Sequence, residues 1–218
     1  MAALDLQEQE QLAELKAWWE KRGNLVLSTL IIVFLAVAAY NGWRYYQRSQ
    51  SLAASAVFDQ LQAATAAGDK AKTREIAGSL LENHAGSSYA PLGALMAAKT
   101  LFSAGEAQTA KAQLQWVIDK GRDDELKHVA RVRLAGILLD EKSYDEGLKV
   151  LDASRPPHFE ALYADRRGDL LLAQGKTQEA RAAWQDALKT ADAKTAMRGS
   201  LELKLELVGS APPATAPK

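Results

Sequence analysis

The stretch GNLVLSTLIIVFLAVAAYNGW, from Gly23 to Trp43, contains no charged residue, and Arg22 and Arg44 close it on either side. A helix rises about 1.5 Å per residue, so 21 residues span roughly the 30 Å of a bilayer's hydrocarbon core. The hydroxyl groups of Ser28 and Thr29 can hydrogen-bond to carbonyl groups of the same helix. The stretch therefore predicts a transmembrane helix over residues 23–43.

Aromatic and basic side chains flank both ends of this stretch. Such side chains favour the membrane–water interface, where one part of the residue contacts lipid and another contacts water. A buried core helix is usually shorter, and a cleaved signal peptide begins with a basic segment, whereas residues 1–22 are rich in Asp and Glu. We therefore expect a retained anchor. Its predicted membrane-interface residues are Trp18, Trp19, Trp43, Arg44, Tyr45 and Tyr46.

Basic residues beside the span predict its orientation. Three precede it (Lys16, Lys21 and Arg22) and two follow it (Arg44 and Arg48), which favours a cytoplasmic N-terminus. Residues 1–22 then form a cytoplasmic amphipathic segment, which either lies at the membrane surface or docks a cytoplasmic partner. The chain after the span is expected outside the cytoplasm.

Composition excludes several classes of function. The chain has 27 basic and 27 acidic residues and no basic face, so nothing points to nucleic-acid binding. It has no cysteine, which excludes disulfides, thiolate metal sites and cysteine nucleophiles.

Residues 44–208 are expected to form a single helical domain, because Ala and Leu dominate and proline is rare. Residues 201–207 alternate apolar and charged side chains, which is typical of a strand. A lone strand would leave its backbone groups without a pairing partner, so we predict a helix here too. The Pro-containing tail, residues 209–218, is expected to be disordered.

A pattern of small and large residues recurs at intervals of 33 and 37 residues. It consists of a small residue, a turn, and then small, large and small residues on a second helix. The three sets are Gly168, Ala180, Trp184 and Ala187; Ala135, Gly147, Leu151 and Ser154; and Ala98, Ala110, Leu114 and Val117. A degenerate fourth helix pair precedes them at residues 52–67 and 70–83. The pattern resembles the tetratricopeptide repeat and predicts an all-α solenoid of helical hairpins behind one transmembrane helix; a generic helical bundle is the alternative.

The order of these parts resembles the family of ancillary subunits of the bacterial Sec translocon. The resemblance covers nearly the whole chain and lies in Gly42-Trp43-Arg44-Tyr45-Tyr46-Gln47, Tyr89-Ala90-Pro91, Leu114-Gln115-Trp116-Val117, Ala130-Arg131-Val132-Arg133-Leu134-Ala135, Phe159-Glu160-Ala161 and Arg167-Gly168-Asp169. The chain departs from the family pattern at the second turn, which lacks glycine and has Lys142-Ser143, and at Arg167, where leucine is usual.

This resemblance implies a single-pass protein of the bacterial inner membrane with its repeat domain in the periplasm. Its implied partners are the Sec translocon channel subunits, a membrane-anchored periplasmic chaperone of the prolyl-isomerase type, unfolded secretory clients and membrane lipid, with no nucleic acid. The implied function is a non-enzymatic scaffold that links emerging polypeptides to periplasmic chaperones. The alternative is a scaffold for another membrane complex of the cell envelope.

The sequence offers no catalytic, cofactor or metal site. Its three histidines, His84, His128 and His158, are scattered. Asp124 and His128 lie one helical turn apart but supply only two ligands, so we interpret them as a solvated salt bridge. Asp123, Asp124 and Glu125 are interpreted as an acidic first turn of a helix.

The predicted binding surface is a mostly apolar groove along the first helix of each repeat. It lacks the cluster of Lys, Arg and Asn by which some tetratricopeptide domains hold a terminal carboxylate. Such a groove suits a helix or an extended apolar segment of a partner, unless the helix near residues 201–208 fills it. The predicted groove residues are Leu92, Leu95, Lys99, Phe102, Val129, Val132, Leu139, Leu162, Asp165, Asp169 and Leu172.

Overall fold

The computed structural model describes residues 2–192 and 195–210, and these are helical with no strand. The chain divides into two compact units, Met1–Gln50 and Ser51–Lys218. Most of the predicted tail, residues 211–218, lies outside the described part. Gly209 and Ser210, which were assigned to that tail, instead form the last turn of helix α9.

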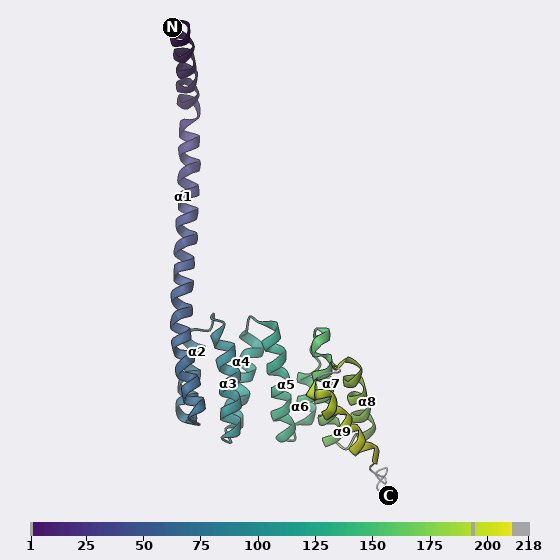
Figure 1. Cartoon of the computed structure of the whole chain (residues 1–218). Helices are drawn as coiled ribbons and strands as arrows, with labels where there is room; N and C mark the ends of the chain where they lie inside the picture. The colour runs from purple at the N-terminus through teal and green to yellow at the C-terminus, as the bar shows by residue number, and fades with distance from the viewer. Residues whose placement is uncertain (1, 193–194, 211–218) are drawn as a thin grey trace. The chain divides into compact units, whose positions relative to one another are not determined.

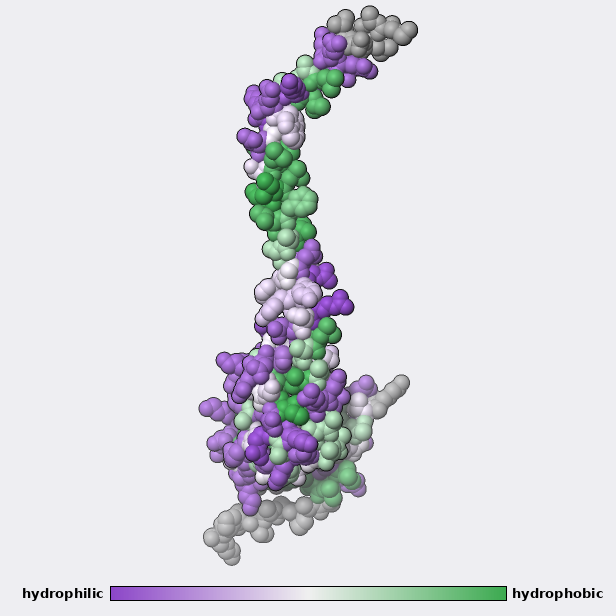
Figure 2. All heavy atoms as spheres, turned by 90° about the vertical axis from the view of Figure 1, so that its left-hand side faces the viewer, coloured by the Kyte–Doolittle hydropathy of each residue, from purple (hydrophilic) through white to green (hydrophobic). Residues whose placement is uncertain are grey.

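The first unit consists of most of a single long helix, α1 (Ala2–Ala66), which continues into the second unit. The predicted cytoplasmic segment and the predicted span belong to this one helix rather than to two. No proline interrupts it, and a glycine such as Gly23 costs a helix only about 1 kcal/mol. Its apolar band is visible in Figure 2. Among the described residues, α1 is the one helix long and apolar enough to cross a membrane.

Two polar side chains within this band satisfy their hydrogen-bonding groups locally. The hydroxyl of Ser28 donates to the carbonyl of Asn24 at 2.7 Å, and that of Thr29 donates to the carbonyl of Leu25 at 2.8 Å. The predicted bonds are therefore present, and neither hydroxyl would need a partner in lipid.

The second unit is a succession of helical hairpins (Figure 1). The end of α1 is followed by α2 (Lys70–Asn83), α3 (Tyr89–Ser103), α4 (Ala107–Lys120), α5 (Asp124–Asp140), α6 (Tyr144–Val150), the 3-10 turn η1 (Pro157–Phe159), α7 (Glu160–Ala173), α8 (Thr177–Thr190) and α9 (Ala196–Ser210). The predicted helix pairs, including the degenerate first pair, are confirmed. The alternating stretch 201–207 is helical, as predicted, and lies in α9.

The four hairpins turn through the same backbone conformation. Gly68, Gly105, Lys142 and Gly175 all have positive φ angles, of 68°, 83°, 62° and 80°. In each turn the next amide donates to a carbonyl five residues earlier; the amide of Glu106, for example, lies 2.9 Å from that carbonyl. This is the hydrogen-bond pattern that ends a helix on a left-handed residue. Lys142 occupies the position where the other turns have glycine.

Small residues allow the two helices of a hairpin to approach closely. Trp184 of α8 is 1% exposed, and its indole packs against Gly168 of α7, where there is no room for a Cβ atom. The indole Nε1 donates to the carbonyl of Asp165 at 3.2 Å. Ala180 and Ala187 on either side are fully buried. Trp184, the large residue of the repeating pattern, thus fills the space between the two helices of this repeat.

The hairpin of α5 and α6, which corresponds to the second of the three predicted repeat sets, departs from the predicted register. Helix α6 has seven residues, whereas α4 and α8 have fourteen each. Ser154, predicted to be a small buried residue, lies beyond α6 and is exposed. The following Pro156 and Pro157 have no amide hydrogen and cannot continue a helix. Phe159 of η1 is buried in the space after the short helix.

The buried residues form three successive clusters. The first runs from the end of α1 to α5, the second joins α5, α6, η1 and α7, and the third joins α7, α8 and α9. Each cluster is shared by neighbouring hairpins, as expected for a solenoid whose units cannot bury their apolar faces alone.

Candidate partner-binding groove

The predicted groove residues lie on α3, α5 and α7, the first helices of three successive hairpins. Leu92 and Leu172 are 41% and 40% exposed, Lys99 is exposed, and Phe102, Val129, Leu139, Leu162, Asp165 and Asp169 are half-buried. Nine of the eleven predicted side chains are therefore exposed or half-buried and accessible to a partner.

Leu95 and Val132 do not line an accessible surface. Each is 6% exposed and belongs to a buried cluster, Leu95 to the first and Val132 to the second. The sequence register placed them on the groove face, but close packing of neighbouring helices turns that edge of α3 and α5 inward. Substitution of either residue by Glu would test the core rather than the groove.

A pocket of about 460 Å³ opens between α3, α5 and α7. Its apolar part includes Phe102, Leu114 and Ile137, and its polar part includes the side chains of Lys99, Arg133, Asp140 and Arg166. We call Lys99, Arg133 and Arg166, with this surrounding pocket, the cationic pocket.

Of the three cations, Lys99 was predicted to line the groove, whereas Arg133 and Arg166 were not, and the groove was expected to be mostly apolar. Arg133 and Arg166 lie 33 residues apart and precede Ala135 and Gly168, the equivalent small residues of the second and third repeats, by the same interval. Equivalent positions in stacked repeats come together in space. This spacing was the signal that could have revealed them.

Hydrogen bonds leave these cations incompletely neutralised. Arg133 donates to the backbone carbonyl of Leu95 at 3.0 Å, and Arg166 pairs with Asp169 at 3.3 Å. Among the described residues, neither Lys99 nor Arg133 forms an ion pair. The carboxylate of Asp140 lines the same pocket but is likewise not in an ion pair within the described ranges.

Helix α9 occupies the other end of the predicted groove. The Nζ of Lys204 donates to Asp165 and to Asp169, at 2.6 Å each, and lies 5.5 Å from the centre of the Trp184 ring. Leu201 of α9 is fully buried in the third cluster. The alternative that the helix near residues 201–208 fills the groove therefore holds over α7, whereas the pocket between α3 and α5 stays open.

The charges at this contact perturb one another. Burial alone lowers the pKa of Lys204, but hydrogen bonds to Asp165 and Asp169 outweigh it and raise that pKa above the ordinary lysine value. Burial raises the pKa of Asp169, partly offset by the bond from Lys204, and the neighbouring Asp165 raises it further. Lys204 thus separates two carboxylates that would otherwise repel each other one helical turn apart.

The chain is similar to known proteins over almost its whole length. The model of the tetratricopeptide repeat-like domain family matches residues 16–210. The ancillary SecYEG translocon subunit of Neisseria gonorrhoeae is 31% identical over 94% of this chain and 98% of the relative. The chain belongs to the family of ancillary SecYEG translocon subunits. The member from Escherichia coli is 30% identical over 91% of this chain and 95% of its own length. No solved structure matches.

The predicted membrane-interface residues of this family member are all exposed side chains of α1 in the first unit. The rings of Trp18 and Trp19 lie 6.5 Å apart, and those of Trp43 and Tyr46 lie 6.4 Å apart. The guanidinium of Arg44 lies 5.8 Å from the centre of the Tyr40 ring, and Tyr45 is also exposed. These aromatic pairs are free to contact lipid headgroups or another protein.

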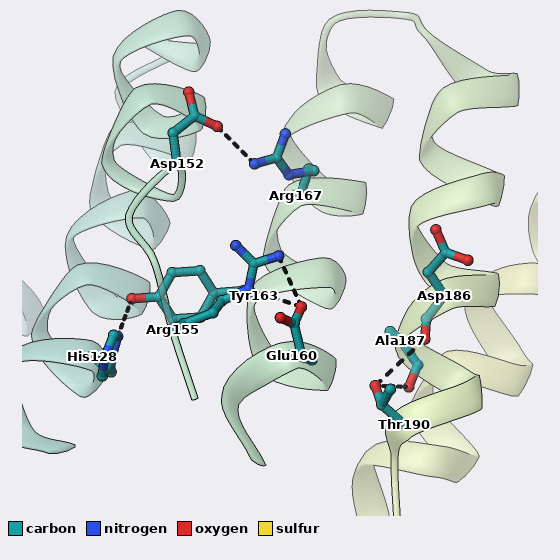
Figure 3. Close-up of polar contacts among 9 residues, drawn as sticks. All are labelled: His128, Asp152, Arg155, Glu160, Tyr163, Arg167, Asp186, Ala187 and Thr190. Carbon is teal, nitrogen blue, oxygen red and sulfur yellow. Dashed lines mark hydrogen bonds and ion pairs between the residues drawn. The ribbon is translucent and has the colours of Figure 1, made fainter. Parts of the chain in front are cut away.

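His128 is a core residue and not part of the predicted salt bridge with Asp124. It is 7% exposed, and its Nδ1 lies 2.8 Å from the hydroxyl of Tyr163 (Figure 3). Asp124 instead pairs with Lys127. Asp123 caps α5 by accepting hydrogen bonds from the amides of Glu125 and Leu126, which confirms the acidic first turn. Burial, together with nearby Arg131, lowers the pKa of His128.

Two further ion pairs join the segment after α6 to α7. Arg155 pairs with Glu160 at 2.8 Å and lies over the Tyr163 ring, with its guanidinium carbon 5.1 Å from the ring centre. Arg167 pairs with Asp152 at 2.8 Å; Figure 3 shows both pairs. Arg167 thus has an ionic partner. The described part of the chain contains no group of three metal-binding side chains.

Proposed function

We propose that this protein is a non-enzymatic scaffold of the bacterial inner membrane that associates with the Sec translocon. The near full-length match to ancillary SecYEG translocon subunits carries this proposal, because it includes both the apolar helix and the repeats. Helix α1 would span the membrane once over residues 23–43, with residues 1–22 in the cytoplasm. The repeat domain, residues 44–208, would lie in the periplasm.

The groove is the proposed surface for polypeptides. A concave face built from successive repeat helices suits an extended or helical partner segment. Its open part, around Lys99 and Phe102, would contact emerging secretory chains or a membrane-anchored chaperone of the prolyl-isomerase type. The scaffold would hold client and chaperone close together and so raise their effective concentration.

The span and its flanks are the proposed contact with the translocon channel. The exposed aromatic side chains at both ends of the apolar band, such as Trp19 and Trp43, would anchor the helix at the two interfaces. Contact with membrane lipid follows from the same residues.

Affinity purification of the full chain from mild detergent tests the assignment. Recovery of channel subunits supports it, and recovery of a different envelope complex without them favours the alternative scaffold. A reporter active only outside the cytoplasm, fused after Leu207, is expected to be active. Activity of a cytoplasmic reporter at that position instead would reverse the orientation.

Site-specific crosslinking tests the groove. Photoreactive side chains at Leu92 and Phe102 are expected to capture a chaperone or client, and one at Gln178, which is exposed on α8, serves as a control. Equal capture from all three positions would refute a localised groove.

A further inference from the structure

We propose that the cationic pocket binds an extended polypeptide segment with two acidic side chains about three residues apart and an apolar side chain between them. This inference rests on the proposed function of the groove and specifies the chemistry of its occupant. It follows from the charge of the pocket, the spacing of its cations and its apolar wall.

The charge of the pocket favours a carboxylate. Its lining carries three cations and the single carboxylate of Asp140, a net charge of +2. Lys99 is exposed and forms no ion pair with any residue that the structure describes, and Arg133 is bound only to a backbone carbonyl. An entering carboxylate would therefore gain charge-assisted hydrogen bonds without first displacing a protein carboxylate from Lys99 or Arg133.

Arg166 has hydrogen-bonding capacity that the protein does not use. Its Nε is buried and has no hydrogen-bond partner in the described residues. Its guanidinium carbon lies 3.5 Å from the place where Gly136 would carry a Cβ atom, so the absence of that atom leaves space beside the guanidinium. The carboxylate of Asp169 lies 3.3 Å from the guanidinium of Arg166 but 2.6 Å from the Nζ of Lys204. Arg166 therefore forms the longer of the two ion pairs with Asp169.

The spacing of the cations favours a segment that passes through the pocket. Arg133 and Arg166 occupy equivalent positions on the neighbouring helices α5 and α7. Packed helices lie about 8–10 Å apart. An extended segment in the polyproline II conformation has three residues per turn and rises about 3.1 Å per residue, so side chains three residues apart lie on the same face, about 9 Å from each other. Two acidic side chains about three residues apart would therefore meet both arginines, whereas a single terminal carboxylate would meet only one.

An apolar wall accompanies the charges. Phe102 is half-buried at the pocket, and Leu114 and Ile137 form its floor. A side chain such as Leu, placed between the two acidic residues, would cover this wall and exclude water from the ion pairs. Ion pairs that are partly shielded from water are less weakened by salt than fully exposed ones.

A peptide titration tests the proposal with the full chain in detergent. The probe is a fluorescent peptide with Asp-Leu-Ser-Asp at its centre and both termini blocked. Two control peptides are compared with it. One carries Asn-Leu-Ser-Asn at its centre, and the other carries the two aspartates side by side. We expect the first peptide to bind about tenfold more tightly than either of the others, as two partly exposed ion pairs would allow.

The matched protein variants remove equal charge inside and outside the pocket. Lys99→Gln with Arg133→Gln is expected to weaken the binding of the first peptide about tenfold. Lys120→Gln with Lys149→Gln, on α4 and α6, is expected to leave it unchanged. An equal loss in both double variants would overturn the proposal, because it would indicate attraction to overall charge alone.

Other outcomes separate this inference from the proposed function. Equal binding of the Asp and Asn peptides, with loss of binding on Phe102→Ala, would overturn the acidic preference but retain an apolar polypeptide groove. Displacement by inorganic phosphate, at constant ionic strength, as effectively as by unlabelled peptide would indicate a general anion site instead. Absence of crosslinks from Leu92 and Phe102 to any polypeptide would contradict the proposed function itself.

Discussion

The indole of Trp184 packs directly against Gly168, so in the hairpin of α7 and α8 the largest side chain of α8 meets the smallest residue of α7. Trp184→Ala would remove that contact, leave a cavity and free the carbonyl of Asp165. We expect the hairpin of α7 and α8, together with α9, to lose about 3–5 kcal/mol of stability. Denaturant titration followed by circular dichroism measures the loss, with Gln185→Ala, exposed on the same helix, as the control.

The reciprocal change adds volume at the same contact. Gly168→Leu would place a side chain where the indole lies and force α7 and α8 apart, which typically costs about 1–3 kcal/mol or more. The double variant Gly168→Leu with Trp184→Ala should be less destabilised than the sum of the two single variants. Additive losses would show that the two residues do not share one packing site.

Lys142 is a non-glycine residue with a φ of 62°. A left-handed backbone conformation costs a residue with a side chain about 1–2 kcal/mol in the folded state. Glycine avoids this strain, but it also makes the unfolded chain more flexible, which offsets part of the gain in stability. We therefore expect Lys142→Gly to stabilise the protein by about 1 kcal/mol. Gly175→Lys, the opposite exchange at the equivalent turn, should destabilise it by a similar amount, and thermal melting of both variants compares them.

His128 gives the folded protein a dependence on pH. Because burial lowers its pKa in the folded state, the unfolded chain takes up a proton first as the pH falls. The contribution of neutral His128 is fully present above the ordinary histidine pKa, about 6.5, and is lost as the pH falls below that value towards the lower folded pKa. Stability should therefore decrease between about pH 7 and pH 5.

A histidine variant and a non-titrating control isolate this effect. In His128→Asn the decrease should be smaller, while in Gln178→Asn, at an exposed position of α8, it should match that of the natural protein. Denaturant midpoints at several pH values measure it. An unchanged pH dependence in His128→Asn would assign the effect to another group.

Lys204 fastens α9 over α7. Lys204→Gln would leave Asp165 and Asp169 without their shared cation, and because the group is partly exposed we expect a loss of about 1–2 kcal/mol. Amide hydrogen exchange should accelerate in α9 more than in α3 or α4. Asp165→Asn with Asp169→Asn, added to Lys204→Gln, should recover part of the protection, since it removes the repulsion between the carboxylates.

The helical hairpins were predictable because they depend on local patterns. Gly168, Ala180 and Trp184 specify close packing within one hairpin, and the turn residues around Gly105 and Gly175 mark where the helices end. The early end of α6 was not predictable from the small-residue pattern, which extended through Leu151 to Ser154. There the two prolines and the burial of Phe159 determined the local structure.

The site was less predictable than the fold because it depends on contacts between repeats. The burial of Leu95 and Val132 depends on how tightly α3 and α5 pack. The junction of Lys204 with Asp165 joins residues 39 apart in sequence, and no local pattern marks it. The cationic pocket likewise required three helices to be in place.

The short α6 also weakens the coupling between unfolding of the repeats before it and unfolding of the repeats after it. In a repeat array each unit is stabilised mainly by its interfaces with neighbouring units. Because α6 has half the usual length, its hairpin offers a smaller interface, and the repeats before and after it stabilise each other less. The hairpins before α6 share the first buried cluster, the hairpin of α7 and α8 shares the third with α9, and the second cluster is the remaining link between the two sides. We expect the two sides to open as separate folding units. The hairpin of α7 and α8, together with α9, could then unfold while Lys99 and Phe102 remain on a folded surface.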